Sequence, residues 1–318
     1  MATCGAVRDM NLSRMREYMQ LHRRVRVADA ARETGMSIPT AAKLISDLVE
    51  SGEMKEVGCC ASTGGRCAMV YEIDPGYLSY LLLRADSGHY SYQVRDYAGD
   101  CLESGHFSAD VSTPGQIESL AKQLKQNYPN LRGICMGVKT FVSQEEAQSA
   151  PLPEAALRSF VEKHFGVPFI MENDVNAVAL ACWKQYGLDR GCIICLHRKN
   201  VGLVIDGKIW RGKNGSNEKN GQYRTLRPLK NIQNLPVSDD PTHYNAFAVG
   251  VYAVTLDPDL VVIYTPDDEP PCDPLAIRTL LEKRFTPEYV PDIVASKKWN
   301  DDYWQGLDME MRAQLGIS

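Results

Sequence analysis

The spacing of apolar residues divides the chain into a short helical part and a longer part of mixed pattern. Up to about residue 75, apolar positions recur at helical intervals in the segments 14–22, 27–35 and 38–49, which predicts three helices. Beyond it, apolar runs of strand length alternate with amphipathic segments. Alternating strands and helices are typical of an α/β protein with layered sheets, and we expect that architecture here.

The second and third helices are joined by a tight turn with clear end signals. Gly35 can adopt the left-handed conformation that ends the earlier helix, and Ser37 is a suitable N-cap for the later one. Pro39 falls in the first turn, where a missing N–H costs nothing. The apolar stripe of this helix consists of Leu44, Ile45, Leu48 and Val49. Two helices around a tight turn predict a helix-turn-helix, whose second helix fits the major groove of DNA.

A pattern of strand, glycine-bearing turn and strand follows, over residues 54–57 and 66–73. We interpret it as the wing of a winged helix, with two glycines and a guanidinium at its tip suited to phosphate or minor-groove contact. The alternative is a small helical hairpin beside an unrelated strand pair, with no role in nucleic-acid binding. The predicted DNA contacts are Ser37, Thr40 and Lys43 from the recognition helix and Arg66 from the wing.

The rest of the chain is assigned by the same patterns. Residues 1–10 predict a disordered or frayed tail, and Ser13 can cap the first helix. The turn at residues 74–76 predicts a domain boundary. The predicted strands are 80–86, 90–96, 101–107, 131–138, 169–171, 192–196, 201–205, 208–210 and 260–264. The predicted helices are 117–128, 155–165, 177–186, 246–254, 276–284 and one near 306–315. The short connection at the boundary predicts two mechanically coupled parts.

Composition narrows the class of protein. The chain has 318 residues, 44% of them hydrophobic and 24% charged, as in ordinary soluble proteins. No apolar run reaches the length of a membrane span and no signal-peptide core is present, so we expect a cytoplasmic protein. The ten cysteines are irregularly spaced and predict reduced thiols. A net charge of −5 excludes a protein that is basic throughout, but DNA binding needs only a local basic face.

Several motifs together resemble the ROK family of repressors, open reading frames and sugar kinases, from about residue 11 to 315. They are Thr63-Gly-Gly-Arg66, Glu172-Asn-Asp-Val-Asn-Ala177, Asp206-Gly-Lys-Ile-Trp-Arg-Gly212 with Asn214-Gly215, and Leu256-Asp-Pro-Asp-Leu-Val-Val-Ile263. The resemblance implies a winged helix-turn-helix at 1–75 and an actin-like (ribonuclease H-like, sugar-kinase type) two-lobed α/β domain at 76–318. Its first lobe would span about 76–190 plus the C-terminal helix, and its second lobe about 191–295.

The chain departs from the family's kinases where they bind nucleotide. Their first phosphate loop reads Asp-x-Gly-Gly-Thr, and here it reads Asp86-Ser-Gly-His-Tyr90, with two bulky residues. Their later Gly-Gly pair is replaced by Thr265-Pro266. Phosphoryl transfer depends on positioning the phosphates, so we expect no enzyme activity and no cofactor.

We also predict no metal site. The family's sugar-binding Glu-x-Gly-His motif, whose histidine binds structural zinc, reads Lys219-Asn-Gly-Gln222 here, and no cysteine lies between Cys195 and Cys272. Tetrahedral zinc needs four nitrogen or sulfur ligands, which these residues do not supply. Cys192 and Cys195 lie three residues apart in a strand, so their thiols face opposite sides and are expected to be core residues.

The candidate ligand site is partly retained. The resemblance implies that Asn173 and Asp174 hold sugar hydroxyls, with Asp174 as general base in the kinases and only a vestige here. The alternative is that Asn173 or Asp174 simply caps the next helix. Lys219 and Gln222 would complete the site and favour an anionic or altered ligand. His164 and His197 have no catalytic partners and are expected at a surface or a strand end.

The leading hypothesis is a transcriptional regulator, most simply a repressor, that binds a double-stranded DNA operator as a homodimer or higher homo-oligomer. The degenerate ROK domain would serve dimerisation and sense a sugar or related metabolite as effector. The rivals are a ROK sugar kinase with a DNA-binding appendage, and a scaffold whose winged helix binds a protein.

Overall fold

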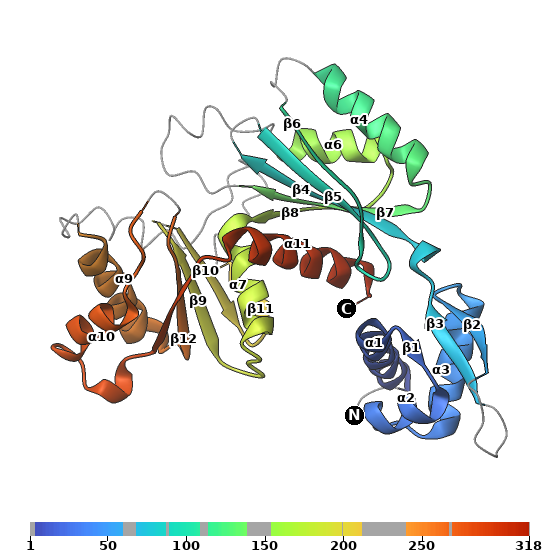
Figure 1. Ribbon diagram of the computed structural model, residues 1–318, viewed down its shortest axis with the longest axis horizontal. Coiled ribbons are helices and arrows are strands. Elements are labelled where there is room, and N and C mark those ends of the chain that lie inside the picture. The colour runs from blue at the N-terminus through green and yellow to red at the C-terminus, as the bar shows by residue number, and fades with distance from the viewer. Residues whose placement is uncertain are drawn as a thin grey trace.

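The computed structural model describes residues 4–59, 68–86, 89–108, 114–138, 154–198, 200–211, 240–266 and 269–317. Figure 1 shows a small helical N-terminal domain and two larger lobes, each built on a five-stranded sheet. Two helices, α7 and α11, lie between the sheets. The arrangement is the mixed α/β architecture expected from the sequence.

The N-terminal domain is a winged helix. Its helices are α1 (Cys4–His22), α2 (Val27–Thr34) and α3 (Ile38–Glu50), and its strands are β1 (Arg24–Val25), β2 (Met54–Cys59) and β3 (Met69–Ile73). The sheet order is β1-β3-β2. Gly35 follows α2 with a φ of 70°, and the Ser37 side chain accepts a hydrogen bond from the backbone N–H of Thr40. The end signals read from the sequence therefore act as predicted.

The prediction for the first helix is wrong at its start. Helix α1 begins at Cys4, so residues 4–13 are helical and Ser13 lies inside the helix rather than capping it. Residues 4–13 contain no proline, and their one glycine costs only about 1 kcal/mol in a helix. Nothing in this local sequence therefore prevents the helix from starting earlier than predicted. Met15 and Met19 on α1 are fully buried and seat the helix in the domain core.

The first lobe is a sheet in the order β6-β5-β4-β7-β8. After a 3₁₀ turn, Pro75–Tyr77, its elements are β4 (Ser79–Asp86), β5 (His89–Asp96), β6 (Cys101–Ser108), α4 (Pro114–Asn127), β7 (Leu131–Val138), α6 (Glu154–His164) and β8 (Phe169–Asn173). Strands β4, β7 and β8 are parallel. Both α4 and α6 lie on one face in Figure 1, and α11 lies on the other.

The second lobe is a sheet in the order β11-β10-β9-β12-β13. Its elements are β9 (Cys192–His197), β10 (Asn200–Ile205), β11 (Lys208–Ile209), α9 (Pro241–Leu256), β12 (Leu260–Tyr264), α10 (Pro274–Glu282), a 3₁₀ turn (Pro287–Tyr289) and β13 (Asp292–Ser296). Strands β9 and β10 form the predicted antiparallel pair. The sequence patterns missed β1 and β13.

Helices α7 (Asp174–Gln185) and α11 (Trp299–Leu315) join the two lobes. They cross in close contact: a Cβ atom at Gly306 would lie under 3.0 Å from the carbonyl oxygen of Ala177. The prediction that the last helix begins near residue 306 is wrong, because α11 begins seven residues earlier. Asp301 and Asp302 in its first turn favour that start, since carboxylates stabilise a helix N-terminus.

Candidate functional site

Helix α3 and its N-cap carry the three side chains that the sequence predicts for DNA contact. Ser37 and Lys43 are exposed and Thr40 is half-buried, whereas Leu44 and Leu48 face the domain core. The hydroxyl groups of Ser37 and Thr40 lie 2.8 Å apart. All three polar groups therefore line the first turns of α3, the part of a recognition helix that reaches base edges.

Charges on α3 are paired but accessible. Lys43 Nζ lies 2.9 Å from Asp47 Oδ1, with 72% of the lysine side chain exposed. Arg8 of α1 reaches the same carboxylate. The hydrogen bond from Lys43, and a second from Arg8, hold the pKa of Asp47 below its ordinary value. Exposed ion pairs contribute little to stability, so both cations can exchange Asp47 for phosphate at small cost. Arg66 of the wing lies outside the described residues.

The candidate ligand site is centred on the start of α7. Asn173 ends β8, and its side-chain oxygen accepts hydrogen bonds from the backbone N–H groups of Val175 and Asn176. Asn173 is therefore the N-cap of α7, as the capping interpretation predicted. Asp174 follows as the first residue of α7, 4% exposed, and its carboxylate accepts from the N–H of Val175 at 2.8 Å.

A buried glutamate organises this turn. Glu172 is 1% exposed, and its Oε1 accepts from the backbone N–H of Asn173 at 2.8 Å and from Asn176 Nδ2 at 2.9 Å. Its Oε2 accepts from Arg211, which follows the β11 strand of the second lobe. One carboxylate thus fixes both the N-cap residue and the guanidinium of the opposite lobe.

The same guanidinium contacts α11. Arg211 Nη2 lies 3.6 Å from Glu310 Oε2, and the arginine side chain is 40% exposed. Burial, together with the neighbouring Glu172 carboxylate, raises the pKa of Glu310, while Arg211 opposes this shift. Arg211 therefore bridges two acidic side chains from β8 and α11. The predicted partners Lys219 and Gln222 lie outside the described residues.

Aromatic side chains fill the carboxyl ends of β9 and β12. His197 stacks on Trp299, with ring centroids 3.9 Å apart, and Tyr264 meets the same indole edge-on at 5.4 Å. The Tyr264 hydroxyl donates to buried Asp302 and lies 3.0 Å from Cys182 Sγ. Tyr264 immediately precedes the Thr265-Pro266 pair. Bulky rings therefore adjoin the position where the family resemblance implies an open glycine pair.

Cys192 and Cys195 behave as core residues. Cys192 and Cys195 are both buried, and they belong to different core clusters on opposite faces of the sheet, as predicted. Burial raises the pKa of the Cys192 thiol to about 11 and raises that of Cys195 as well. Among the described residues, no group of three or more histidine, cysteine, aspartate or glutamate side chains could hold a metal ion. His197 ends β9, the strand-end position expected of it, whereas His164 is half-buried at the end of helix α6.

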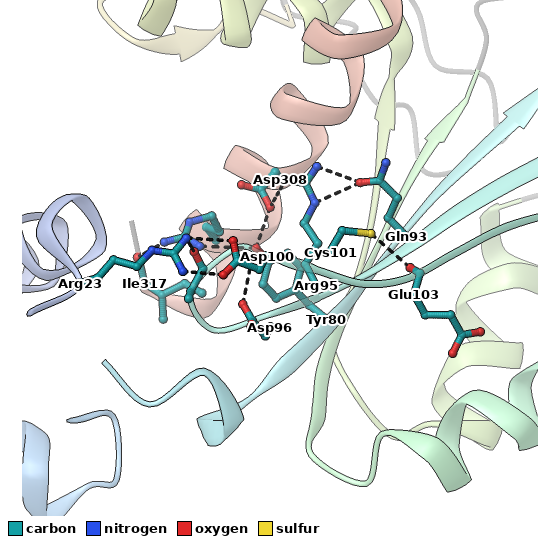
Figure 2. Close-up of polar contacts among 12 residues, drawn as sticks. Arg23, Tyr80, Gln93, Arg95, Asp96, Asp100, Cys101, Glu103, Asp308 and Ile317 are labelled. Atoms are coloured by element: carbon teal, nitrogen blue, oxygen red, sulfur yellow. Dashed lines mark hydrogen bonds and ion pairs between the residues drawn. The ribbon is translucent and has the colours of Figure 1, made fainter. Parts of the chain in front are cut away.

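A polar network joins the winged helix to the first lobe. Arg16 of α1 donates two hydrogen bonds to the carboxylate of Glu53, at 2.7 and 2.8 Å, and Tyr97 of the β5–β6 turn donates a third at 2.5 Å. Burial of Glu53 opposes its charge, but Arg16 and Tyr97 hold its pKa below the ordinary value. Figure 2 shows a second link, in which Arg23 pairs with Asp100 of the same turn.

The apolar core is also continuous across this boundary. One cluster of buried residues includes Met15 and Met19 of α1, Leu78 and Tyr80 of the first lobe, and Ile317 after α11. These contacts support the expected mechanical coupling of the two parts. In the described part of the chain, no helix is both long and apolar enough to cross a membrane.

Comparison with known proteins identifies a family domain in this chain. Residues 89–225 match the model of the ROK family. The chain carries a ROK family domain. It is similar to a xylose repressor of Caldicellulosiruptor bescii, with 23% identity over 55% of this chain and 49% of the relative. It is similar also to the DNA-binding transcriptional dual regulator NagC of Escherichia coli, with 22% identity over 58% of this chain and 50% of NagC. The matched region spans about half the length of these relatives.

Solved structures show the same fold. A ROK family transcriptional regulator, a homologue of the Escherichia coli MLC protein, aligns with a TM-score of 0.62 at 14% identity, over 98% of this chain and 99% of that one. A ROK hexokinase from Thermus thermophilus aligns with a TM-score of 0.52 at 14% identity, over 76% of this chain and 100% of the hexokinase. The predicted combination of a winged helix with an actin-like, sugar-kinase-type domain is therefore confirmed as a fold.

Sequence patterns missed three residues of interest. Ile38, in the first turn of α3, is 60% exposed. Ile38 lies seven residues, about two helical turns, before buried Ile45, so helical spacing alone would place it on the apolar stripe and predict burial. Arg211 and Glu310 lie in recognisable segments, but their contact with Glu172 depends on tertiary structure alone.

Proposed function

We propose that this protein is a DNA-binding transcriptional repressor whose ROK domain is a non-catalytic effector and dimerisation module. The main support is the exposed first turn of α3, where Ser37, Thr40 and Lys43 present hydroxyl and ammonium groups away from the domain core. Similarity over more than half of the chain to a xylose repressor and to the transcriptional dual regulator NagC supports a regulatory function.

The recognition helix would read base edges and the wing would contact the backbone. Hydroxyl groups of Ser37 and Thr40 can donate to bases or phosphate, and Lys43 can bind phosphate or guanine. Exposed Ile38 would contact a thymine methyl group, which apolar side chains recognise in the major groove. Arg66 would contact phosphate or the minor groove from the wing. Two copies of the chain would place two recognition helices on paired half-sites.

The ROK domain would bind a sugar or sugar derivative at the start of α7. Asn173 and Asp174 would hold hydroxyl groups there, with Lys219 and Gln222 completing the site. A ligand that prefers one domain arrangement shifts the population able to span both half-sites, which couples metabolite concentration to DNA affinity.

Selection of genomic DNA fragments at two salt concentrations tests the DNA-binding part. We expect selective binding that weakens with salt, and that Lys43→Ala and Arg66→Ala each reduce both affinity and salt slope, since each removes about one phosphate contact. Lys184→Ala removes an exposed lysine from the end of α7 and serves as the matched control. A wild-type protein that selects no fragment at either salt concentration would refute the proposal.

A sugar kinase with a DNA-binding appendage is the second candidate, favoured by the hexokinase-like fold and the retained Asp174. The aromatic packing of Trp299, Tyr264 and His197 argues against it, because nucleotide binding needs close backbone approach to phosphate. ATP-dependent phosphorylation of pentoses, hexoses and N-acetylated hexosamines is the test. Sustained turnover that disappears in Asp174→Ala would establish the kinase instead.

A further inference from the structure

Helix α11 is seated on the first lobe along its length. Two glycines of β7 allow this close approach, as Gly306 does on α11 itself. A Cβ atom at Gly133 would collide with Met311 of α11, and a Cβ atom at Gly137 would collide with Tyr303. Asp308 accepts a hydrogen bond from Tyr80 at 2.6 Å and pairs with Arg95 at 3.0 Å, as Figure 2 shows in part. A helix packed this closely moves as one body, because tightly packed interfaces shift between discrete arrangements rather than deform.

One turn of α11 reaches the candidate ligand site. Glu310 lies 3.6 Å from Arg211, and Arg211 also binds the buried Glu172 carboxylate. Glu172 in turn fixes the backbone N–H of Asn173 and the side chain of Asn176. A ligand that draws the half-exposed guanidinium toward itself therefore changes the charge beside Glu310.

The end of the same helix reaches the winged helix. Gly316 ends α11 with a φ of 68°, and its carbonyl oxygen accepts a hydrogen bond from Arg16 Nη1 at 2.9 Å. Arg16 is the residue that binds Glu53 at the domain junction. Ile317, 2% exposed, is buried in the core shared by both domains. Glu310 and Gly316 are six residues apart, which is about 9 Å along a helix.

We propose that Arg211 is the residue through which the candidate ligand site acts on the winged helix, by way of Glu310, α11 and Arg16. The inference rests on the proposed function for the existence of an effector and an operator, but the coupling itself is a property of the apo protein. It assigns a positioning role to Arg211, whose two acidic partners belong to the ligand-site turn and to the helix that contacts Arg16.

Amide hydrogen exchange of the full-length protein tests the coupling without any ligand. Arg211→Gln removes the bridge, and Glu310→Gln removes only its α11 end while Arg211 keeps Glu172. We expect both variants to speed amide exchange by about fivefold or more in the last turns of α11 and in α1 around Arg16. A factor of about five is the lower end of the range typical of allosteric coupling. Lys208→Gln, an exposed change in the same hairpin, should leave both segments within about twofold of wild type.

The outcomes separate the two proposals. Faster exchange confined to the hairpin and the start of α7 would overturn the inference, because the bridge would then be only local. Unchanged exchange at α1 in Glu310→Gln would overturn it even if Arg211→Gln destabilises the fold. On the DNA fragment selected by the wild type, both bridge variants should change affinity by about fivefold, and Lys208→Gln should not. If the wild type selects no fragment, the proposed function fails, while hydrogen exchange still decides the coupling.

Discussion

Glu53→Gln tests whether the domain junction depends on a buried ion pair. The Glu53 carboxylate is 3% exposed and accepts four hydrogen bonds, two from Arg16, one from Tyr97 and one from Ser51. Glutamine has nearly the same shape, but only one of its terminal atoms accepts hydrogen bonds. In the variant, the amide nitrogen takes the place of one carboxylate oxygen. If it replaces Oε1, its N–H groups face Arg16 Nη2; if it replaces Oε2, they face the Tyr97 hydroxyl and Arg16 Nε.

The expected loss follows from these contacts. Removing one partner of a fully buried pair costs about 3–5 kcal/mol, and a single hydrogen bond to a charged group contributes about 1.5–3 kcal/mol. The Arg16 side chain is 22% exposed and keeps its bond to the Gly316 carbonyl, so the cation is not stranded. We therefore expect Glu53→Gln to lower the free energy of unfolding by about 2–3 kcal/mol.

The distribution of tryptophan provides a probe for each part. All four tryptophans lie beyond residue 180, so their fluorescence reports on the ROK domain, whereas far-ultraviolet circular dichroism reports on both parts. In urea, Glu53→Gln should lower both midpoints, with the dichroism midpoint preceding the fluorescence midpoint as the winged helix loses its support. Glu56→Gln, an exposed change on the β2 strand that follows Glu53, should stay within about 0.5 kcal/mol of wild type. Equal stability of the two variants would refute the reasoning.

The loss should also depend on pH with a definite sign. Burial acts to raise the pKa of Glu53, but hydrogen bonds from Arg16 and Tyr97 outweigh it, so the folded pKa lies below the ordinary value of 4.5. A carboxyl group whose pKa is lowered by folding stabilises the protein above its unfolded pKa, and this contribution is lost as pH falls through the folded pKa. The difference between wild type and Glu53→Gln should be complete near neutral pH and shrink below about pH 4.5.

Three further outcomes follow from packing and burial. Gly306→Ala should lower thermal stability by about 2 kcal/mol or more, since overpacking exceeds the gain in helix propensity, whereas Gly5→Ala, with open space around it, should not destabilise. Asn173→Ala should cost about 1 kcal/mol in urea unfolding through loss of the N-cap, and Asn173→Asp should recover most of it. Mass-spectrometric mapping of alkylation should find exposed Cys101 modified in the native protein and buried Cys195 modified only on unfolding.

Local signals were enough to predict the winged helix and most of the sheets. Gly35 and Ser37 mark the ends of neighbouring helices through backbone preferences that do not depend on tertiary contacts, and both act as expected. Strand β7, Leu131–Val138, begins and ends where its apolar run does, because both faces of the strand are covered.

Errors arose where a helix lacks an apolar stripe or a strong cap. Helix α1 starts at Cys4 in a stretch of exposed residues, and α11 starts after Lys298, whose side chain makes no capping hydrogen bond. In the early turns of α11, Trp299 packs against His197 of the second lobe, and Tyr303 packs against Gly137 of the first lobe. Both partners come from strands that are distant in sequence, so no local pattern could show these contacts.

Only part of the candidate ligand site could be predicted from the sequence, because some of its contacts are again long-range. Asn173 and Asp174 lie next to each other in a recognisable motif, whereas Arg211 reaches Glu172 across 39 residues and Glu310 belongs to the distant helix α11. Long-range pairs of this kind depend on how the two lobes meet. The expected contacts of Arg66, Lys219 and Gln222 stay predictions.

The structural work done by the Glu-Asn-Asp motif bears on the choice between regulator and kinase. Glu172 holds the turn through Asn173 and Asn176, and Asn173 caps α7, whose buried face packs against both lobes. These contacts would be needed in a protein of this fold whether or not it phosphorylates a sugar. The presence of the motif is therefore weak evidence for catalysis, because its loss would destabilise the position of α7 whether or not the protein is a kinase. The aromatic side chains of Tyr264 and Trp299 carry more weight, since they adjoin the Thr265-Pro266 pair, which stands where the family resemblance implies two glycines.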